Sequence, residues 1–502
     1  MHPILQSFAV IMQWDCLLAL FIGVVGGMVI GIIPGLGPSA GIALLIPITF
    51  TMRPEAALIM MVAMYASGVY GGSITAILCH TPGTAASAAT AIDGYALTKK
   101  GRGAEAVGMA TIASVFGGCV GALALIFFAP PLGRFSMRFS ALEYFLIASF
   151  GLIVVSNLTG KAMAKGLFAA ALGLLIGTVG MDPMTGVQRF TFGSLTLEDG
   201  IDYTPVLIGL FSLSQALVLV ENMVKGKNSI FDDPSKNIRG SVIPEWSELK
   251  KSIGTICRSS VIGAFIGFIP AAGASIASWI NYGIAKKSSK NPEEYGNGSL
   301  DGIAASESGN NAACGGAMIP LFTLGIPGSA ATAIMFGGML MHGLIPGSKL
   351  FTEQAVSTYT IFLGFLFANI LMGIIGLSLS RQLSKVCIIP NAILVPLIIS
   401  VSIIGTYSLN NNLFEVWLMI GFGILGYFMK MYDFETAPLV LGIVLCDILE
   451  SNFRRAIILS RGNMWKYFCG RPISIVVAVC ILITLFSPII VKWFKKTVQK
   501  QA

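Results

Sequence analysis

The chain has 502 residues, of which 55% are hydrophobic and only 11% are charged. Soluble globular domains carry roughly 25% charged residues, so this composition excludes a soluble protein and predicts a protein of the lipid bilayer. The net charge of +8 is spread over short loops rather than gathered into one basic patch. Nucleic acid is therefore not expected as a partner.

The N-terminal segment and the cysteines exclude two further classes. The first Lys or Arg is Arg53, and without a basic segment before the first apolar run we expect neither a cleavable signal peptide nor a transit peptide. The nine cysteines show no C-x-x-C pair and no metal-ligand spacing with histidine. A disulfide scaffold, a zinc site and a resident cofactor are therefore not expected.

Long apolar runs begin near the N-terminus. The runs at 17–33 and 104–129 are long enough to cross a hydrocarbon core of about 30 Å. The predicted fold class is therefore an all-α polytopic membrane protein.

Two ordered pairs of Gly/Pro motifs predict that the chain contains an internal repeat. The first pair is Gly27-x3-Gly31-x2-Pro34-x2-Gly37 and Gly263-x3-Gly267-x2-Pro270-x2-Gly273, at an offset of 236 residues (Pro34 to Pro270). The second pair is Tyr70-Gly-Gly followed by Thr81-Pro-Gly-Thr84, and Cys314-Gly-Gly followed by Ile326-Pro-Gly-Ser329. One such cluster is common in membrane helices, but two ordered pairs about half a chain apart indicate a repeat.

Loop charges predict that the two halves are inverted relative to each other. Basic loops at 99–102, 161–165 and 221–258 are expected inside, and the acidic stretch at 182–202 outside. The segment from Arg258 to Lys286 is too short for two full crossings, which indicates a re-entrant hairpin with its tip at Pro270–Gly273. By symmetry, 15–50 is expected to form the matching hairpin, and the next helix in each half is expected to break at Pro82–Gly83 or Pro327–Gly328.

The predicted organisation has four parts: a first membrane repeat at 1–222, a cytoplasmic linker at 223–252, a second membrane repeat at 253–450 and a C-terminal segment with the last transmembrane helix at 451–502. One region conflicts with the positive-inside rule. Helices expected near 356–380, 388–408, 413–429 and 435–449 leave five basic residues between Arg454 and Arg471 outside. A surface-lying amphipathic stretch or a miscounted helix would each remove that conflict.

Breaks in membrane helices predict a polar cavity, because unpaired backbone groups at mid-membrane depth survive only in protein or beside water. Half-helix N-termini direct amide donors at an anion, while exposed carbonyls suit sodium. The residues expected to bind substrate are Gly35, Gly37, Ser39, Thr81, Gly83, Thr84, Gly273, Ser275, Asn310, Asn311, Gly328 and Ser329. Those expected beside a coupling ion, with sodium considered, are Pro34, Pro82, Gly325, Pro327 and Thr332.

The alternative for the small residues is close helix packing, which we favour for Gly27-x3-Gly31 and Gly263-x3-Gly267. Two acids lie near the motifs, and a carboxylate inside a membrane is a functional candidate. Asp93 is interpreted as a solvated helix end, because it precedes Gly94 and the basic loop at 99–102. For Glu307, an interior position and a loop edge both remain open.

Several of these motifs together resemble the large membrane subunit of the tripartite tricarboxylate transporters, over residues 15–472. The motifs are Gly31-Ile-Ile-Pro-Gly-Leu-Gly-Pro38, Tyr70-Gly-Gly-Ser-Ile-Thr-Ala-Ile-Leu78, Thr81-Pro-Gly-Thr-Ala85, Thr90-Ala-Ile-Asp-Gly-Tyr95, Glu307-Ser-Gly-Asn-Asn-Ala312 and Leu324-Gly-Ile-Pro-Gly-Ser329. The resemblance implies secondary active uptake of a citrate-like di- or tricarboxylate across a bacterial inner membrane, driven by a sodium or proton gradient. It also implies two partners, a small four-helix membrane subunit and a periplasmic solute-binding protein.

Two departures from the family pattern leave the identity of the substrate open, but they do not change the expected class of transporter. Cys79-His80 stands where a small polar or branched pair is expected, and Ala271-Ala272 replaces Gly-Leu of the first hairpin. The sequence leaves open the identity of the carboxylate, the coupling ion and the oligomeric state.

Rival functions are weaker. Gly37-Pro-Ser39-Ala-Gly41 fits the G-x-S-x-G pattern of serine hydrolases, with His80 or His342 as a base, but a nucleophile elbow needs a strand-turn-helix context. We therefore expect no enzyme. A nucleotide-driven pump lacks its G-x4-G-K-[ST] motif, and an assembly subunit would not need breaks in both halves. A cation antiporter remains the serious alternative, although it should carry more buried acids.

Overall fold

The computed structural model describes residues 3–158, 163–182, 184–226, 238, 241–270 and 272–485. In these residues nearly all regular structure is helical, and strands β1 (Gly180–Met181) and β2 (Gln188–Arg189) form one small antiparallel pair. The expected all-α class is confirmed for this part of the chain. The expected linker at 223–252 and the last turns of the expected final helix lie partly outside the described residues.

Helices of the first half are interrupted at both predicted places. The elements are α1 (Pro3–Ile11), α2 (Trp14–Ile32), α3 (Gly37–Thr49), α4 (Pro54–Cys79), the 3-10 turn η1 (Ala85–Ser87), α5 (Ala88–Lys99) and α6 (Gly103–Ser136). The gap between α2 and α3 contains Pro34, and the gap between α4 and η1 contains Pro82. Proline lacks an amide hydrogen and disfavours a helical residue before it, which explains both interruptions.

In the second half, helices are interrupted at the other two predicted places. Its elements are α11 (Trp246–Phe268), α12 (Gly273–Ser288), η5 (Pro292–Glu294), α13 (Leu300–Leu324), α14 (Ala330–Met341), α15 (Ser348–Thr352), α16 (Ala355–Ser384), η6 (Lys385–Ile388), α17 (Asn391–Asn410) and α18 (Leu413–Met431). The interruptions lie between α11 and α12 and between α13 and α14. Between the halves, α9 (Tyr203–Leu207), the π-helical η3 (Ile208–Leu213) and α10 (Ser214–Val224) form one continuous helix.

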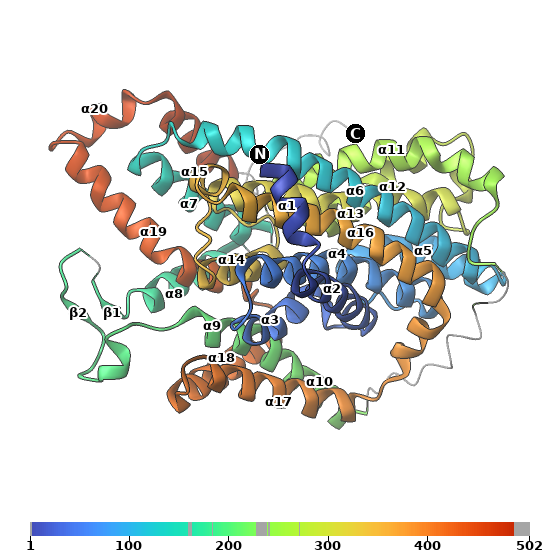
Figure 1. The fold of residues 1–502 in the computed structure, drawn as a ribbon, viewed down its shortest axis with the longest axis horizontal. Helices are drawn as coiled ribbons and strands as arrows, with labels where there is room; N and C mark the ends of the chain where they lie inside the picture. Colours follow the sequence, from blue (N-terminus) through green and yellow to red (C-terminus); the bar gives the residue numbers. More distant parts are fainter. Residues whose placement is uncertain are drawn as a thin grey trace, which may run out of the picture. The chain divides into compact units, whose positions relative to one another are not determined.

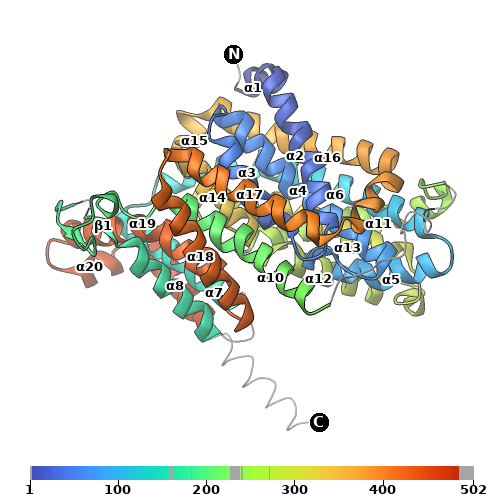
Figure 2. The ribbon, with the colours of Figure 1, turned by 90° about the horizontal axis from the view of Figure 1, so that it is seen from below.

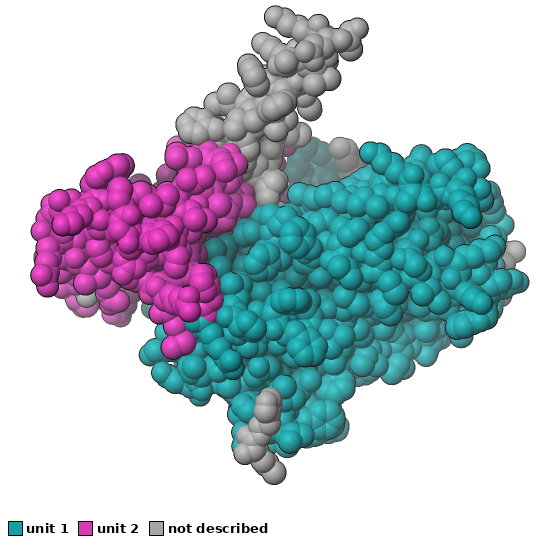
Figure 3. All heavy atoms as spheres, turned by 90° about the horizontal axis from the view of Figure 1, so that it is seen from above, with its two compact units in different colours: residues 1–134, 204–427 teal, residues 135–203, 428–502 magenta. Residues whose placement is uncertain are grey.

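The remaining elements are α7 (Ala141–Leu158), α8 (Met163–Gly177), η2 (Leu195–Leu197), α19 (Ala437–Leu459), α20 (Met464–Cys469) and a last apolar helix, Pro472–Leu485. The chain divides into two compact units, 1–134 with 204–427 and 135–203 with 428–502 (Figure 3). All predicted site residues belong to the first unit. The two units are defined by packing, so they do not test the predicted boundaries of the repeats. Those boundaries remain a prediction.

Seven helices in the described residues are long and apolar enough to cross a membrane: 14–32, 54–79, 103–136, 203–224, 355–388, 391–408 and 413–431. Five shorter apolar helices accompany them, including Gly37–Thr49 and Ala330–Met341. With the composition, these helices identify a multi-pass membrane protein.

Glycines pack the two halves in corresponding ways. In the first half α2 lies against α4, and in the second α11 lies against α13 (Figure 1). A Cβ added to Gly31 would lie 2.2 Å from the carbonyl oxygen of Gly68, and one added to Gly267 would lie 2.2 Å from that of Ala313. Both glycines therefore bring two helix backbones into contact, as small residues do in membrane helices.

The packing also gives a residue-by-residue correspondence between the two halves. A Cβ on Gly71 would meet the carbonyl oxygen of Met28 at 2.6 Å, and one on Gly316 would meet that of Ala264 at 2.1 Å. Gly71 therefore corresponds to Gly316, an offset of 245 that also relates Gly83 to Gly328. The sequence motif had paired Gly71 with Gly315, which instead faces Gly121 of α6. The expected match of the Gly-Gly pairs was wrong by one residue.

In the second compact unit, ion pairs balance two of the five basic residues that conflicted with the topology. Helix α19 runs to Leu459, ten residues beyond its expected end at 449. Arg454 on this helix pairs with Asp182 at 2.8 Å, and Arg471 pairs with Glu143 at 2.8 Å. Arg454 therefore lies beside the acidic stretch at 182–202, and the charges of both arginines are balanced by acids.

Candidate functional site

The first break ends α4 at a left-handed residue. His80 adopts φ +55 and stacks on Tyr95 with ring centroids 4.6 Å apart. The Gly83 amide then donates to the carbonyl of Gly72 at 3.2 Å, which folds the break back onto α4. A Cβ on Gly83 would lie 2.1 Å from the carbonyl oxygen of Gly31, so only glycine fits between the two backbones.

The second break has the same outline. Gly325 ends α13 with φ +69, and the Ile326 amide donates to the carbonyl of Pro320 at 3.2 Å. A Cβ on Gly328 would lie 2.8 Å from the Cβ of Ala317. The next helix, α14, begins with a capping box in which Ser329 and Thr332 bond to each other's backbone amides.

A pair of hydroxyl-bearing residues follows each break. The Thr332 hydroxyl donates to the Ser329 carbonyl at 2.9 Å, and the Ser87 hydroxyl donates to the Thr84 carbonyl at 2.9 Å. Thr84 and Ser87 correspond to Ser329 and Thr332 at the offset of 245. The same local geometry is therefore built twice.

Each broken helix also reaches the break of the other half. The Tyr65 hydroxyl of α4 lies 3.1 Å from the Ser329 hydroxyl, and the Asn310 amide of α13 donates to the Ala86 carbonyl at 3.3 Å. Tyr65 and Asn310 are equivalent positions at the offset of 245. The two long helices thus exchange contacts across the interface between the halves.

Helices α3 and α12 continue this exchange. Helix α3 contacts α14 (Figure 2), and α12 contacts η1, so each of these helices packs beside the break of the other half. Gly273, with φ +59, begins α12 and lies near the second break, where an added Cβ would be 3.7 Å from the Ser329 Cβ. Gly35 and Gly37 also have positive φ, but Gly35 is exposed and the adjacent Ile33 and Leu36 pack on α10 and α17.

The predicted site residues therefore fall into separate groups. Gly273, Gly328, Ser329 and Thr332 meet at the second break, and Gly83 and Thr84 are buried at the first. Asn310 belongs to the interface, whereas the Asn311 amide lies 3.8 Å from Met372 Sδ of α16. Ser39 and Ser275 are half-buried on α3 and α12, and Pro34, Thr81, Pro82, Gly325 and Pro327 form the bends themselves.

Asp93 is not a solvated helix end. Its carboxylate is fully buried and accepts hydrogen bonds from the Tyr282 hydroxyl at 2.9 Å and from three backbone amides at Gly296, Gly298 and Ser299. That interpretation was wrong, because the loop after α12 folds over the end of α5. Asp93 therefore ties the first half to the second.

Glu307 lies in the interior rather than at a loop edge. It is fully buried on α13 and accepts hydrogen bonds from Ser73 of α4, Thr90 of α5 and Ser114 of α6. Ser73, Ser114 and Tyr65 were not predicted from the sequence as partners in these contacts. The available signal was a hydroxyl inside an otherwise apolar run, which here marks a polar contact between helices.

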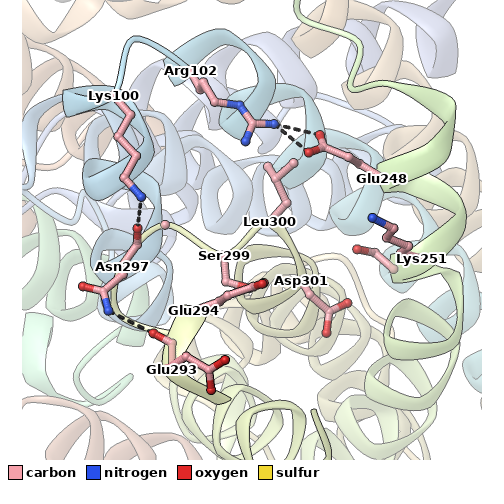
Figure 4. A pocket seen from close by; sticks show the side chains of 12 residues that line it. Lys100, Arg102, Glu248, Lys251, Glu293, Glu294, Asn297, Ser299, Leu300 and Asp301 are labelled. Atoms are coloured by element: carbon pink, nitrogen blue, oxygen red, sulfur yellow. Dashed lines mark hydrogen bonds and ion pairs between the residues drawn. The ribbon is translucent and has the colours of Figure 1, made fainter. Parts of the chain in front are cut away.

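A separate cavity of about 510 Å³ opens near Lys100 and Glu248 (Figure 4). Arg102 beside it pairs with Glu248, and the carboxylates of Glu105 and Glu248 raise the pKa of Arg102 above its usual value. The charged lining consists of Lys100, Arg102 and Lys251 against Glu248, Glu293, Glu294 and Asp301. Acids outnumber bases, and no predicted site residue lines this cavity, so we do not assign a carboxylate to it.

Comparison with known proteins gives the family. A model described as the tripartite tricarboxylate transporter TctA family matches residues 17–441. The chain belongs to this family. The resemblance of the sequence motifs is thereby confirmed, and the family is one of transporters that work in three-part systems rather than one of enzymes.

Two proteins of Agrobacterium vitis are similar to this TctA-family chain. One, named "Uncharacterized 52.8 kDa protein in TAR-I ttuC' 3'region", is 37% identical over 476 residues, which cover 93% of each chain. The other, named "Uncharacterized protein in TAR-II ttuC' 3'region", is 38% identical over 231 residues, which are 45% of this chain and 95% of that protein. No solved structure matches the chain.

Proposed function

We propose that this TctA-family chain is the permease subunit of a secondary carboxylate transporter in a bacterial inner membrane. It takes up a citrate-like di- or tricarboxylate, driven by a sodium or proton gradient. A small four-helix membrane subunit completes it in the membrane, and a periplasmic solute-binding protein delivers the substrate.

The observation that carries this proposal is the pair of equivalent breaks, each contacted by the long helix of the other half through Tyr65 or Asn310. Helix breaks with free backbone donors suit an anion, and a second break in matching position suits alternating access by two related halves. Substrate is proposed to bind between the breaks and the hairpin tips, at the residues predicted from the sequence. A coupling ion would be held beside the same loops.

Contacts between helix ends support the inverted arrangement of the halves. Arg102 pairs with Glu248, and Lys165 donates to the carbonyl of Tyr432, and all four residues are expected inside. Ser357 donates to Glu55 at 2.5 Å, and both are expected outside. These contacts join groups that the loop charges assign to the same side, as an inverted repeat with re-entrant hairpins requires.

Cysteine labelling tests the topology. Lys100→Cys should react with a membrane-impermeant thiol reagent only from the cytoplasmic side, and Asp199→Cys only from the opposite side. Labelling of both from one side would contradict the predicted topology of the first half, because an even number of crossings would then separate them.

Vesicle uptake tests the function. The chain is reconstituted with its two partners, and uptake of labelled citrate and succinate is measured with sodium and proton gradients imposed separately. Accumulation against the carboxylate gradient, lost when the binding protein is omitted, is the expected result. Exchange of sodium for protons without carboxylate movement would instead favour a cation antiporter.

A further inference from the structure

The carboxylate of Glu307 lies at the junction of four helices without a cationic partner. Ser73 donates to its Oε1 at 2.6 Å and Ser114 to its Oε2 at 2.9 Å, while Thr90 also donates to Oε1. The ion pairs found among the described residues do not include Glu307. A buried carboxylate without a counter-ion is costly in a membrane interior unless it gains a positive charge.

Distances within the cluster favour a proton as that charge. The serine oxygens at 2.6 and 2.9 Å from the carboxylate are at hydrogen-bonding separation. The cluster is therefore held together by hydrogen bonds, which is the arrangement expected of a carboxyl group that binds and releases a proton.

Hydroxyl groups allow the cluster to hold Glu307 in either protonation state. A hydroxyl both donates and accepts, so each can turn its hydrogen towards an ionised carboxylate or accept the hydrogen of a neutral one. Thr90 lies 2.8 Å from the Ser306 hydroxyl, which also donates to the Ile303 carbonyl at 3.1 Å. This series of hydroxyls lets the hydrogen bond between Thr90 and Glu307 reverse its direction without movement of a helix.

The cluster combines Glu307 of the second half with hydroxyls of the first half, and the equivalent positions do not repeat it. At the offset of 245, the positions equivalent to Glu307, Ser73 and Thr90 are Val62, Met318 and Met335, and all three are buried. The cluster is therefore not required by the packing that both halves share. A coupling group that binds one ion per cycle needs only one such position.

The cluster is connected to the first break. Thr90 lies on α5, which follows that break, and Asn310, one turn after Glu307, donates to the Ala86 carbonyl within it. The fully buried titratable groups on the packed helices, besides Glu307, are Tyr65 and Tyr70 of α4, Asp93 of α5, which is held by amides, and Cys314 of α13. None of these four is a cation, and the two basic residues of these helices, Lys99 of α5 and Arg134 of α6, are exposed at helix ends.

We propose that Glu307 carries the proton that couples carboxylate transport to a proton gradient, and that Thr90 links its charge to the first break. This inference rests on the proposed transport function. One proton adds from water to a carboxylate oxygen of Glu307, and the same proton returns to water on the other side. Only O–H bonds form and break in this step.

Transport by the reconstituted complex tests the coupling. With labelled citrate and succinate, Glu307→Gln should lower accumulation driven by a pH gradient at least tenfold, while exchange of internal for external carboxylate stays within about threefold and no longer varies with pH. Glu307→Asp should restore part of the pH-driven accumulation, and Glu198→Gln, a change in the second compact unit, should alter neither mode. A purely structural role would lower exchange and accumulation together in Glu307→Gln.

Infrared difference spectra of the purified complex test proton binding without transport. Acidification of the wild type should produce the carbonyl band of a protonated carboxylic acid, and Glu307→Gln should lack that band while Glu198→Gln keeps it. An unchanged band in Glu307→Gln overturns the proposal, as does accumulation that follows sodium and ignores the pH gradient. A wild type that binds this proton but moves no carboxylate would contradict the proposed function alone.

Discussion

The break after α4 and the break after α13 share their backbone packing and differ in their side chains. Gly83 at the first break is enclosed by the backbone of Gly31, and the helix that follows is hydrogen-bonded to Glu307 through Thr90. At the second break, the half-buried Ser329 faces Tyr65 and lies beside Gly273. Matching backbone packing in the two halves therefore accompanies different side chains: the first break adjoins an ionisable group, and the second carries a half-buried hydroxyl.

Valine at the two break glycines should give the largest effect and should separate the breaks. In Gly83→Val the new Cβ would lie 2.1 Å from a backbone oxygen. That oxygen cannot move aside unless α2 separates from the break. We therefore expect the variant to lose membrane insertion or all transport. Gly328→Val meets the Ala317 side chain at 2.8 Å and should be milder but still strongly impaired. Membrane yield, size-exclusion profile and vesicle uptake measure both.

A glycine in open surroundings provides the matched control. Gly283 of α12 has a negative φ and no atom within 4 Å of an added Cβ, so Gly283→Val should be inserted and active. Normal transport by both Gly83→Val and Gly328→Val would mean that the breaks do not form the site.

Single hydroxyl deletions should have intermediate effects that differ between the breaks. Ser329→Ala removes contacts to Tyr65 and Thr332, and a neutral hydrogen bond contributes about 0.5–1.5 kcal/mol, so its affinity loss should be roughly threefold to tenfold. Thr84→Ala is expected at the lower end of this range, because the Thr84 hydroxyl has a longer contact, 3.4 Å, with Ser87. Substrate dependence of uptake measures both.

Tyr65→Phe tests whether the Ser329 contact across the halves is a real coupling. Combined with Ser329→Ala, it should add little further loss, because both changes remove the same hydrogen bond. Independent, additive effects would show that the two hydroxyls act separately.

The smallest effect on transport is expected from Asp182 in the second compact unit, far in sequence from both breaks. Hydrogen bonds from the Met184 backbone amide and from Arg454 lower the pKa of Asp182 to about 2. A lowered pKa stabilises the fold above the ordinary value near 3.8, and this contribution is lost as the pH falls towards 2. Asp182→Asn should therefore lower the thermal unfolding temperature at pH 7, and the difference should shrink towards pH 2.

Much of the scaffold could be predicted from the sequence, because proline and glycine act locally. Pro34, Pro82, Pro270 and Pro327 lie at interruptions of the helices, as expected. The end of α19 was misjudged, since charged residues were taken to mark a loop although Arg454 is neutralised by Asp182. Such pairing depends on segments 272 residues apart and leaves no local signal.

The side chains around the site were less predictable for the same reason. Glu307 could be singled out by its charge, but its three hydroxyl partners come from three other helices. Asp93 was assigned to solvent because its neighbours in sequence are polar, whereas its hydrogen-bond donors lie some 200 positions later. The exact register between the halves, such as the match of Gly71 to Gly316, depends on backbone contacts between helices. A sequence motif does not show these contacts.

Substrate protection of a cysteine at the second break tests the central claim that carboxylate binds between the breaks. The native cysteines are first replaced, and Ser329→Cys is then introduced. Its rate of reaction with a small thiol reagent is measured in the complex with and without a saturating concentration of the transported carboxylate. Asp199→Cys serves as the control. We predict several-fold slower labelling of Ser329→Cys with substrate and no change at Asp199→Cys. Equal labelling of Ser329→Cys with and without substrate, or protection confined to Asp199→Cys, would contradict this site.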